Sequence, residues 1–191
     1  MTGKTHQIIG FASLLIGAAV FMPDSLNAYT LTACILGNSI GSFTPDLDDA
    51  GNRLWDMLPA GNFVGRFARK IFYRHRTITH SILGGFLFYK GFSWLIPRMV
   101  NPAYVDIHLV IISIMTGYIA HLAADMLTID GVPLLFPFKW YFGIPPISFL
   151  RIRTGSWVET FLVFPGVIIA TFAFIVSHYS SYIELIQLIR S

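Results

Sequence analysis

Charged side chains are scarce in this sequence of 191 residues: Asp, Glu, Lys and Arg together make up only 12% of it. A soluble domain carries about 25% charged residues, and the mean hydropathy here is +0.64. These values argue against a simple soluble globule. Intrinsic disorder is excluded as well, because the chain contains 17 Phe, 8 Tyr and 4 Trp residues and disordered chains are poor in aromatic residues.

Cysteine is almost absent too. The single Cys34 excludes an internal disulfide and any zinc site built from several thiolates.

No internal repeat, low-complexity segment or separate soluble domain is visible. No small-x-small cleavage site follows the first apolar stretch, so we expect a mature helix there rather than a signal peptide. Residues 1–191 are therefore expected to form a single integral-membrane domain.

Apolar stretches of membrane-spanning length are abundant. A transmembrane helix needs about 20 apolar residues, so a chain of this length has room for roughly four to six of them. The predicted spans are 6–22, 27–43, 80–97, 108–128 and 157–178. The predicted fold class is therefore all-α, a polytopic membrane helix bundle with about five transmembrane helices.

Two segments between these spans have patterns of their own. Segment 129–156 is apolar but contains Pro133, Pro137, Pro145 and Pro146, which predicts a loop at the membrane interface rather than a regular span. Segment 62–74 has Phe and Ile near helical spacing with Arg and Lys between them. That pattern is typical of an interfacial amphipathic helix lying flat on the bilayer.

Basic residues are distributed unevenly between the two sides of this five-span topology. The N-terminus, the 44–79 loop and the 129–156 loop lie on one side and together hold 10 of the 13 Lys and Arg residues. The positive-inside rule places this side in the cytoplasm and the C-terminus outside. We expect membrane lipids with anionic headgroups to contact the 44–79 loop, and no nucleic acid, because a short basic stretch beside a membrane more often meets lipid.

Histidine and acidic residues gather on the same side. Four clusters contribute: Thr5-His6, Pro45-Asp46-Leu47-Asp48-Asp49, His75-Arg76-Thr77-Ile78-Thr79-His80-Ser81 and His121-Leu122-Ala123-Ala124-Asp125. The topology was deduced from Lys and Arg alone, so the convergence of His and acidic residues is a separate indication of one site at the cytoplasmic face.

Several of these residues also have a purely structural interpretation. His6 alone reads as an ordinary interfacial histidine, and the aspartates after Pro45 as a solvated turn, although carboxylates this close repel one another and a cation relieves that repulsion. His75 and His80 are five apart, so on one helix they would lie on different faces. Glu159 follows Ser156-Trp157-Val158 in a capping-box pattern, and either closes the start of the last helix or joins the site.

His121 and Asp125 carry the strongest signal. They are four residues apart and therefore share one face of a helix, inside an otherwise apolar segment. Burying an ionised Asp near lipid is costly unless it is paired or bound to a metal. A simple His–Asp pair is the alternative, but together with the other clusters the pattern favours a metal site. Imidazole nitrogen and carboxylate oxygen suit Zn²⁺ best, ahead of Mn²⁺ or Fe²⁺.

These motifs resemble the YdjM-type family of bacteria, whose members are described as LexA-regulated, inner-membrane, metal-dependent hydrolases. The resemblance covers residue 5 to about residue 137, and its most specific part is His75-Arg76-x-x-Thr79-His80-Ser81. The family is distantly similar to zinc-dependent phospholipase C and P1-type nuclease, which implies phosphoester chemistry. The chain departs from those enzymes because Gly155, not His, precedes Glu159 by four residues. One or two metal ions are therefore expected rather than three.

The expected function is a metal-dependent hydrolase of the bacterial inner membrane, acting on a phosphoester of a lipid or amphiphilic substrate. The predicted ligands and their close neighbours are His6, Asp46, Asp48, His75, His80, His121 and Asp125. Asp49 or Asp48 is the predicted general base, and Arg76 is a predicted phosphate contact or, equally, a topology anchor. The alternative is a non-catalytic metal-binding membrane protein, either a transporter or a scaffold. The substrate and the oligomeric state stay open.

Overall fold

A computed structural model of the chain describes residues 1–48 and 77–190. The predicted interfacial helix over 62–74 and the predicted site residues Asp49, His75 and Arg76 lie outside the described residues. Within the described ranges the secondary structure is helical, with no strand beyond two isolated bridges between residue pairs. The all-α fold class is confirmed for this part of the chain.

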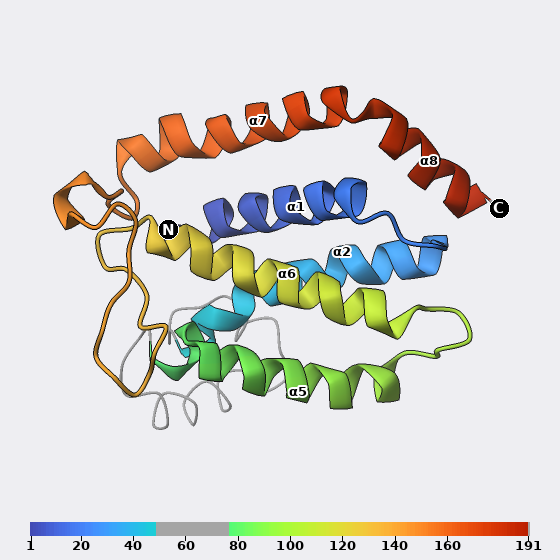
Figure 1. Ribbon diagram of the computed structural model, residues 1–191, viewed down its shortest axis with the longest axis horizontal. Helices are drawn as coiled ribbons and strands as arrows, with labels where there is room; N and C mark the ends of the chain where they lie inside the picture. Colours follow the sequence, from blue (N-terminus) through green and yellow to red (C-terminus); the bar gives the residue numbers. More distant parts are fainter. Residues whose placement is uncertain (49–76, 191) are drawn as a thin grey trace.

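Six α-helices and four shorter helical turns make up the described chain. The helices are α1 (Gly3–Val20), α2 (Ala28–Phe43), α5 (Ile82–Met99), α6 (Ile107–Met126), α7 (Phe164–Ser177) and α8 (Tyr179–Arg190). The turns are η1 (Thr44–Asp48), η2 (Ile78–His80), η3 (Ser148–Leu150) and η4 (Glu159–Val163). Helix α6 is central: it contacts α1, α2 and α5, while α7 packs on α1 at the edge of the bundle (Figure 1).

Three of the helices begin at polar caps. The side chains of Asn27, Ser81 and Asp106 each accept a hydrogen bond from the backbone N–H three residues later, at 2.8, 3.0 and 3.0 Å. Such a cap satisfies one of the backbone donors that the first helical turn leaves without a partner. Ser81 therefore fixes where α5 starts, and His80 lies immediately before that cap.

The predicted number of membrane crossings is confirmed only in part. Helices occupy all five predicted spans, but among the described residues only α6 and the continuous stretch Glu159–Ser177 are long and apolar enough to cross a membrane. Helix α2 has 16 residues, fewer than the roughly 20 that a crossing needs. Lys4 in α1 and Lys90 in α5 lower the hydropathy of those helices. Five transmembrane helices are therefore not confirmed.

Glycine lets the central helices approach one another closely. A Cβ atom added at Gly41 of α2 would collide with the backbone carbonyl of Ile114 in α6, and one at Gly117 of α6 with that of Asn38 in α2. Small residues at such crossings allow backbones to touch. The same crossing is held by the Asn38 side-chain amide, which donates to the Ser113 carbonyl at 3.2 Å. The C-terminal end of α2 is thereby brought against α6.

The outer helix presents apolar side chains to the surroundings. Helix α7 has no buried residue, and large side chains along and just before it, such as Phe161 and Phe172, are 71% and 68% exposed. An exposed apolar surface of this extent is typical of a membrane or partner contact. Segment 129–156, predicted as a loop, contains only the short turn η3 and isolated bridges, and Arg151 holds it by donating to the carbonyls of Pro145 and Pro146.

Candidate metal centre

Four predicted ligands meet at one end of the bundle. Asp46 lies in η1, His80 ends η2, and His121 and Asp125 come from the last turns of α6. In Figure 1 the C-terminal end of α6 lies beside the N-terminus. One donor atom from each residue lies within 4.8 Å of all the others, so this group, which we call the four-atom cluster, could hold a metal ion.

The spacing within the four-atom cluster suits a shared ion better than direct hydrogen bonds. Asp46 Oδ1 is 3.5 Å from His80 Nε2 and 3.4 Å from His121 Nε2. Asp125 Oδ2 is 3.5 and 3.6 Å from the same two nitrogens. Hydrogen bonds from N–H to oxygen are about 2.7–3.2 Å long. Ligand atoms at about 2.0–2.1 Å from a tetrahedral ion are separated by about 3.3–3.4 Å.

The orientation of His121 is set by the backbone of α2. Its Nδ1 atom lies 2.7 Å from the carbonyl oxygen of Ser42, which can only accept, so Nδ1 carries the hydrogen. In the neutral ring Nε2 then presents a lone pair to the four-atom cluster, and this buried atom has no hydrogen-bond partner among the described residues. A metal-ligating histidine commonly donates its other N–H to a backbone carbonyl in this way.

Asp125 is oriented from the opposite side. Its Oδ1 atom lies 3.2 Å from His6 Nε2 and 2.6 Å from the amino group of Met1, which directs Oδ2 toward His80 and His121. His6 is buried, and its ring stacks on that of His121 with 3.6 Å between centroids. The structure therefore places His6 against the ligands, outside the four-atom cluster.

Asp48 also lies outside this group, although we had expected it among the ligands. Its Oδ2 atom is 3.9 Å from His80 Nδ1, on the side of the ring that faces away from the cluster. The same oxygen accepts a hydrogen bond from the Thr79 hydroxyl at 2.7 Å. Asp48 thus contacts Thr79 and the far side of the His80 ring rather than the donor atoms of the cluster.

Asp46 is the most exposed member of the four-atom cluster. Its side chain is 21% exposed, whereas those of His80, His121 and Asp125 are 0 to 1% exposed. Burial raises the pKa of Asp46, but when the neighbouring His121 and His80 rings are protonated they outweigh burial and hold that pKa well below its usual range. The carboxylate is therefore ionised at neutral pH, as a metal ligand must be.

Of the two roles considered for Glu159, the structure shows the structural one, at the start of a helix. Its Oε1 atom accepts from the backbone N–H and the hydroxyl of Thr2 at 2.6 and 2.9 Å, and Oε2 accepts from the N–H of Gly155 at 2.8 Å. The Ser156 hydroxyl in turn lies 3.4 Å from the Glu159 N–H. Glu159 closes the start of the helical stretch formed by η4 and α7, and ties the first turn of α1 to it.

Sequence reasoning missed two supports of the site. Ser42 acts through its main-chain carbonyl, which no side-chain pattern reveals. Thr79 contacts His80 Nδ1 through its hydroxyl, while its neighbour Ser81 caps α5. The signal available for Thr79 was its position directly before a candidate ligand, His80.

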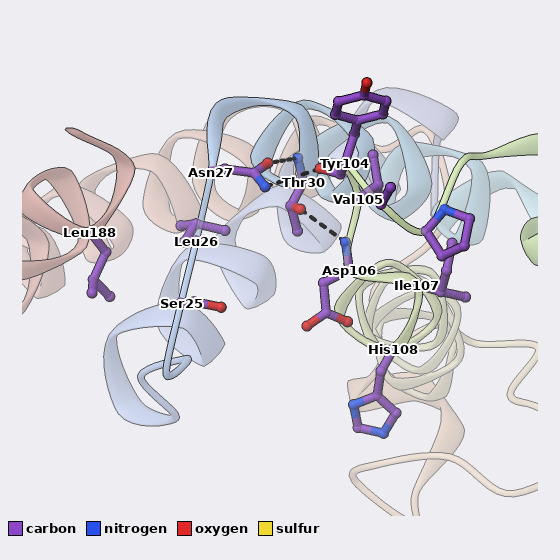
Figure 2. A pocket seen from close by; sticks show the side chains of 12 residues that line it. Ser25, Leu26, Asn27, Thr30, Tyr104, Val105, Asp106, Ile107, His108 and Leu188 are labelled. Carbon is purple, nitrogen blue, oxygen red and sulfur yellow. Dashed lines mark hydrogen bonds between the residues drawn. The ribbon is translucent and has the colours of Figure 1, made fainter. Parts of the chain in front are cut away.

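The opposite end of the bundle has a hollow of about 600 Å³ between the α1–α2 and α5–α6 connections. Figure 2 shows its polar groups hydrogen-bonded to one another: Asn27 accepts from the Thr30 N–H, and the Thr30 hydroxyl accepts from the Asp106 N–H. The second of these bonds joins the start of α2 to the α5–α6 connection. Among the described residues, the four-atom cluster is the group of His and acidic side chains that meets the geometry of a metal site.

Residues 1–185 match the family described as YdjM inner membrane protein. The chain belongs to this family. It is 29% identical to the uncharacterized protein YvsG of Bacillus subtilis (strain 168) over 171 residues, which cover 90% of this chain and 92% of that protein. It is 33% identical to the inner membrane protein YdjM of Escherichia coli (strain K12) over 129 residues, 62% of this chain and 55% of that protein.

The same identity and coverage relate the chain to the inner membrane protein YdjM of Shigella flexneri. No solved structure matches it. Family membership and the two apolar helices agree with an inner-membrane protein. The expected resemblance is thereby confirmed, and the four-atom cluster belongs to a protein of this membrane family.

Proposed function

We propose that this protein is a metal-dependent hydrolase that acts at the cytoplasmic face of the inner membrane, on a phosphoester of a lipid or other amphiphile. The observation that supports it is the four-atom cluster: two imidazoles and two carboxylates with His–Asp separations of 3.4 to 3.6 Å. Three members are buried and Asp46 is partly exposed, so a reacting group would approach from the Asp46 side.

The donor set and spacing favour Zn²⁺, with Mn²⁺ second, and one or two ions. Such an ion, when bound, lowers the pKa of a coordinated water to about 7 and polarises a phosphoryl oxygen. Asp46, His80, His121 and Asp125 would hold it. Asp49 as general base and Arg76 as phosphate contact stay predictions, because both lie outside the described residues.

The position of the cluster near helix ends supports a lipid substrate. Asp125 is the penultimate residue of α6, one of the two helices apolar enough to cross a membrane, and His80 directly precedes the cap of α5. Donors at helix ends would meet the headgroup region rather than the acyl chains. The cytoplasmic orientation is a proposal from the charge asymmetry of the sequence, in which one side holds 10 of 13 Lys and Arg.

A structural metal site is the second candidate, and a specific observation favours it. Four protein ligands fill a tetrahedral ion completely, as in structural zinc sites, whereas catalytic sites usually keep one position open. A transporter is less well supported, because transport sites usually lie near the bilayer midplane, whereas these donors lie near helix ends.

The test is metal content and turnover measured on the same preparation. The full chain in lipid nanodiscs is analysed for metal, then assayed with bis-p-nitrophenyl phosphate and with phospholipid, before and after chelation. The hydrolase proposal expects bound metal and chelator-sensitive turnover, both lost in His121→Ala and kept in His108→Ala, whose ring is exposed at the other end of α6. Bound metal without turnover on either substrate would favour the structural site, and absence of metal would contradict both.

A further inference from the structure

Two side chains, those of Thr79 and Asp48, lie behind His80. Thr79 Oγ1 is 2.7 Å from Asp48 Oδ2 and 3.1 Å from His80 Nδ1. All three residues are buried, at 5% exposure or less. The contacts lie on the far side of the imidazole from Nε2, the atom that belongs to the four-atom cluster.

The direction of these hydrogen bonds follows from counting hydrogens. An ionised carboxylate only accepts, and a hydroxyl has a single hydrogen to donate. The Thr79 hydroxyl therefore donates to Asp48 and can only accept from His80, so His80 Nδ1 carries the hydrogen. The neutral ring then presents the Nε2 lone pair to the cluster, which is the tautomer that the Ser42 carbonyl imposes on His121.

We propose that Asp48 and Thr79 form a positioning relay that fixes the tautomer and orientation of His80, and that Asp48 sets metal affinity through this relay without being a ligand. The proposal rests on the metal site named above but not on hydrolysis. Outer partners of ligating histidines raise metal affinity by roughly 10- to 100-fold.

The backbone around Thr79 is held in place for this role. The Tyr118 hydroxyl donates to the Thr79 carbonyl at 2.6 Å. Asp48 Oδ2 lies 3.4 Å from the Thr77 N–H, in addition to the Thr79 hydroxyl. Thr79→Val, which keeps the side-chain shape, therefore removes the relay hydroxyl while these backbone contacts stay. His80 Nδ1 then loses the Thr79 hydroxyl as its acceptor. This contact no longer holds the ring hydrogen on Nδ1, so the tautomer with the hydrogen on Nε2 becomes more populated.

The experiment is a double-mutant cycle on Zn²⁺ affinity, measured by competition with a chromogenic chelator on the full chain in detergent. We expect Thr79→Val and Asp48→Ala each to lose roughly 10- to 100-fold in affinity, and the double variant to lose no more than either alone, because both remove the same relay. Thr79→Ser, which keeps the hydroxyl, should bind within a few-fold of wild type. Thr116→Val is the matched control, since the Thr116 hydroxyl donates to Ile112 on an exposed part of α6.

The absorption spectrum of the Co²⁺-loaded protein separates a relay from a ligand. Asp48→Ala should keep the wild-type band positions, whereas Asp46→Ala, which removes a cluster oxygen, should shift them. The proposal is overturned if Thr79→Val binds Zn²⁺ as wild type does, if the losses multiply in the double variant, or if Asp48→Ala shifts the Co²⁺ bands. If Thr79→Val does not fold, the Co²⁺ spectrum of Asp48→Ala and the Zn²⁺ affinity of Thr79→Ser still test the relay. Wild-type protein that binds no metal would instead contradict the metal site itself.

Discussion

The imidazole rings of His6 and His121 lie almost parallel, 3.6 Å apart at their centroids and 7° apart in plane. His6 also approaches Asp125, with Nε2 3.2 Å from Oδ1. One residue of α1 therefore contacts both members of the His121–Asp125 pair of α6. The first helix is in this way part of the support of the four-atom cluster.

Replacing His6 should weaken metal binding without abolishing it. His6→Phe keeps a flat ring against His121 but loses the contact with Asp125, so we expect roughly a 10-fold loss of Zn²⁺ affinity, the lower end of the range for outer partners. His6→Ala should lose more, because it also leaves a cavity beside His121. Chelator competition measures both. Complete loss of metal in His6→Phe would mean that His6 is itself a ligand.

Glu159 should matter for stability and not for metal. Glu159→Ala removes the acceptors of Thr2 and Gly155, and we expect it to lower the free energy of unfolding by roughly 0.5–2 kcal/mol, as loss of a helix cap does. Thermal unfolding and metal content of the same sample provide the measurement. A variant of unchanged stability that lost its metal would place Glu159 in the site.

The α2–α6 crossing should tolerate no side chain larger than hydrogen at Gly117. Gly117→Ala forces a methyl group into the Asn38 carbonyl, and we expect a destabilisation of about 1–3 kcal/mol. Gly166→Ala in α7 is the matched control, since nothing lies within 4 Å of its added Cβ. Equal unfolding temperatures for the two variants would show that the crossing is looser than described here.

The His121–Asp125 pair was predictable because helical periodicity is local. Two residues four apart share a helix face whatever surrounds them, and the apolar neighbours signalled that this face is buried. Asp46 and Asp48 could not be told apart in the same way. They lie in the short turn η1, where three residues per turn place them about 120° apart around the axis. Which of the two faces the cluster depends on how η1 packs against α6.

The location of the helices was also predictable, but the number of crossings was not. Hydropathy located all the long helices, but the Ser81 cap that fixes the start of α5 was not predicted. Whether a helix crosses a membrane depends on its length and on single charges: α2 has only 16 residues, and Lys90 lowers the hydropathy of α5. The role of Ser42 was beyond prediction, because it acts through its backbone.

Orientation is open to a direct test by cysteine labelling. In a Cys34→Ala background, single cysteines are placed at Ala103, in the α5–α6 connection, and at Arg153, before the stretch formed by η4 and α7; both positions are exposed. A membrane-impermeant maleimide should label Ala103→Cys in intact cells and Arg153→Cys only after permeabilisation, because the positive-inside rule places the basic loop inside. The reverse pattern would overturn the orientation, and equal labelling would exclude opposite sides.

The most direct test of the four-atom cluster is X-ray absorption at the metal edge of the purified full-length chain. A site made by Asp46, His80, His121 and Asp125 predicts a shell of nitrogen and oxygen at about 2.0–2.1 Å, with imidazole scattering and no sulfur, if the ion is Zn²⁺. This signal should disappear in His121→Ala and persist in His108→Ala. Protein that binds no metal after loading, or a shell unchanged in His121→Ala, would contradict the metal centre described here.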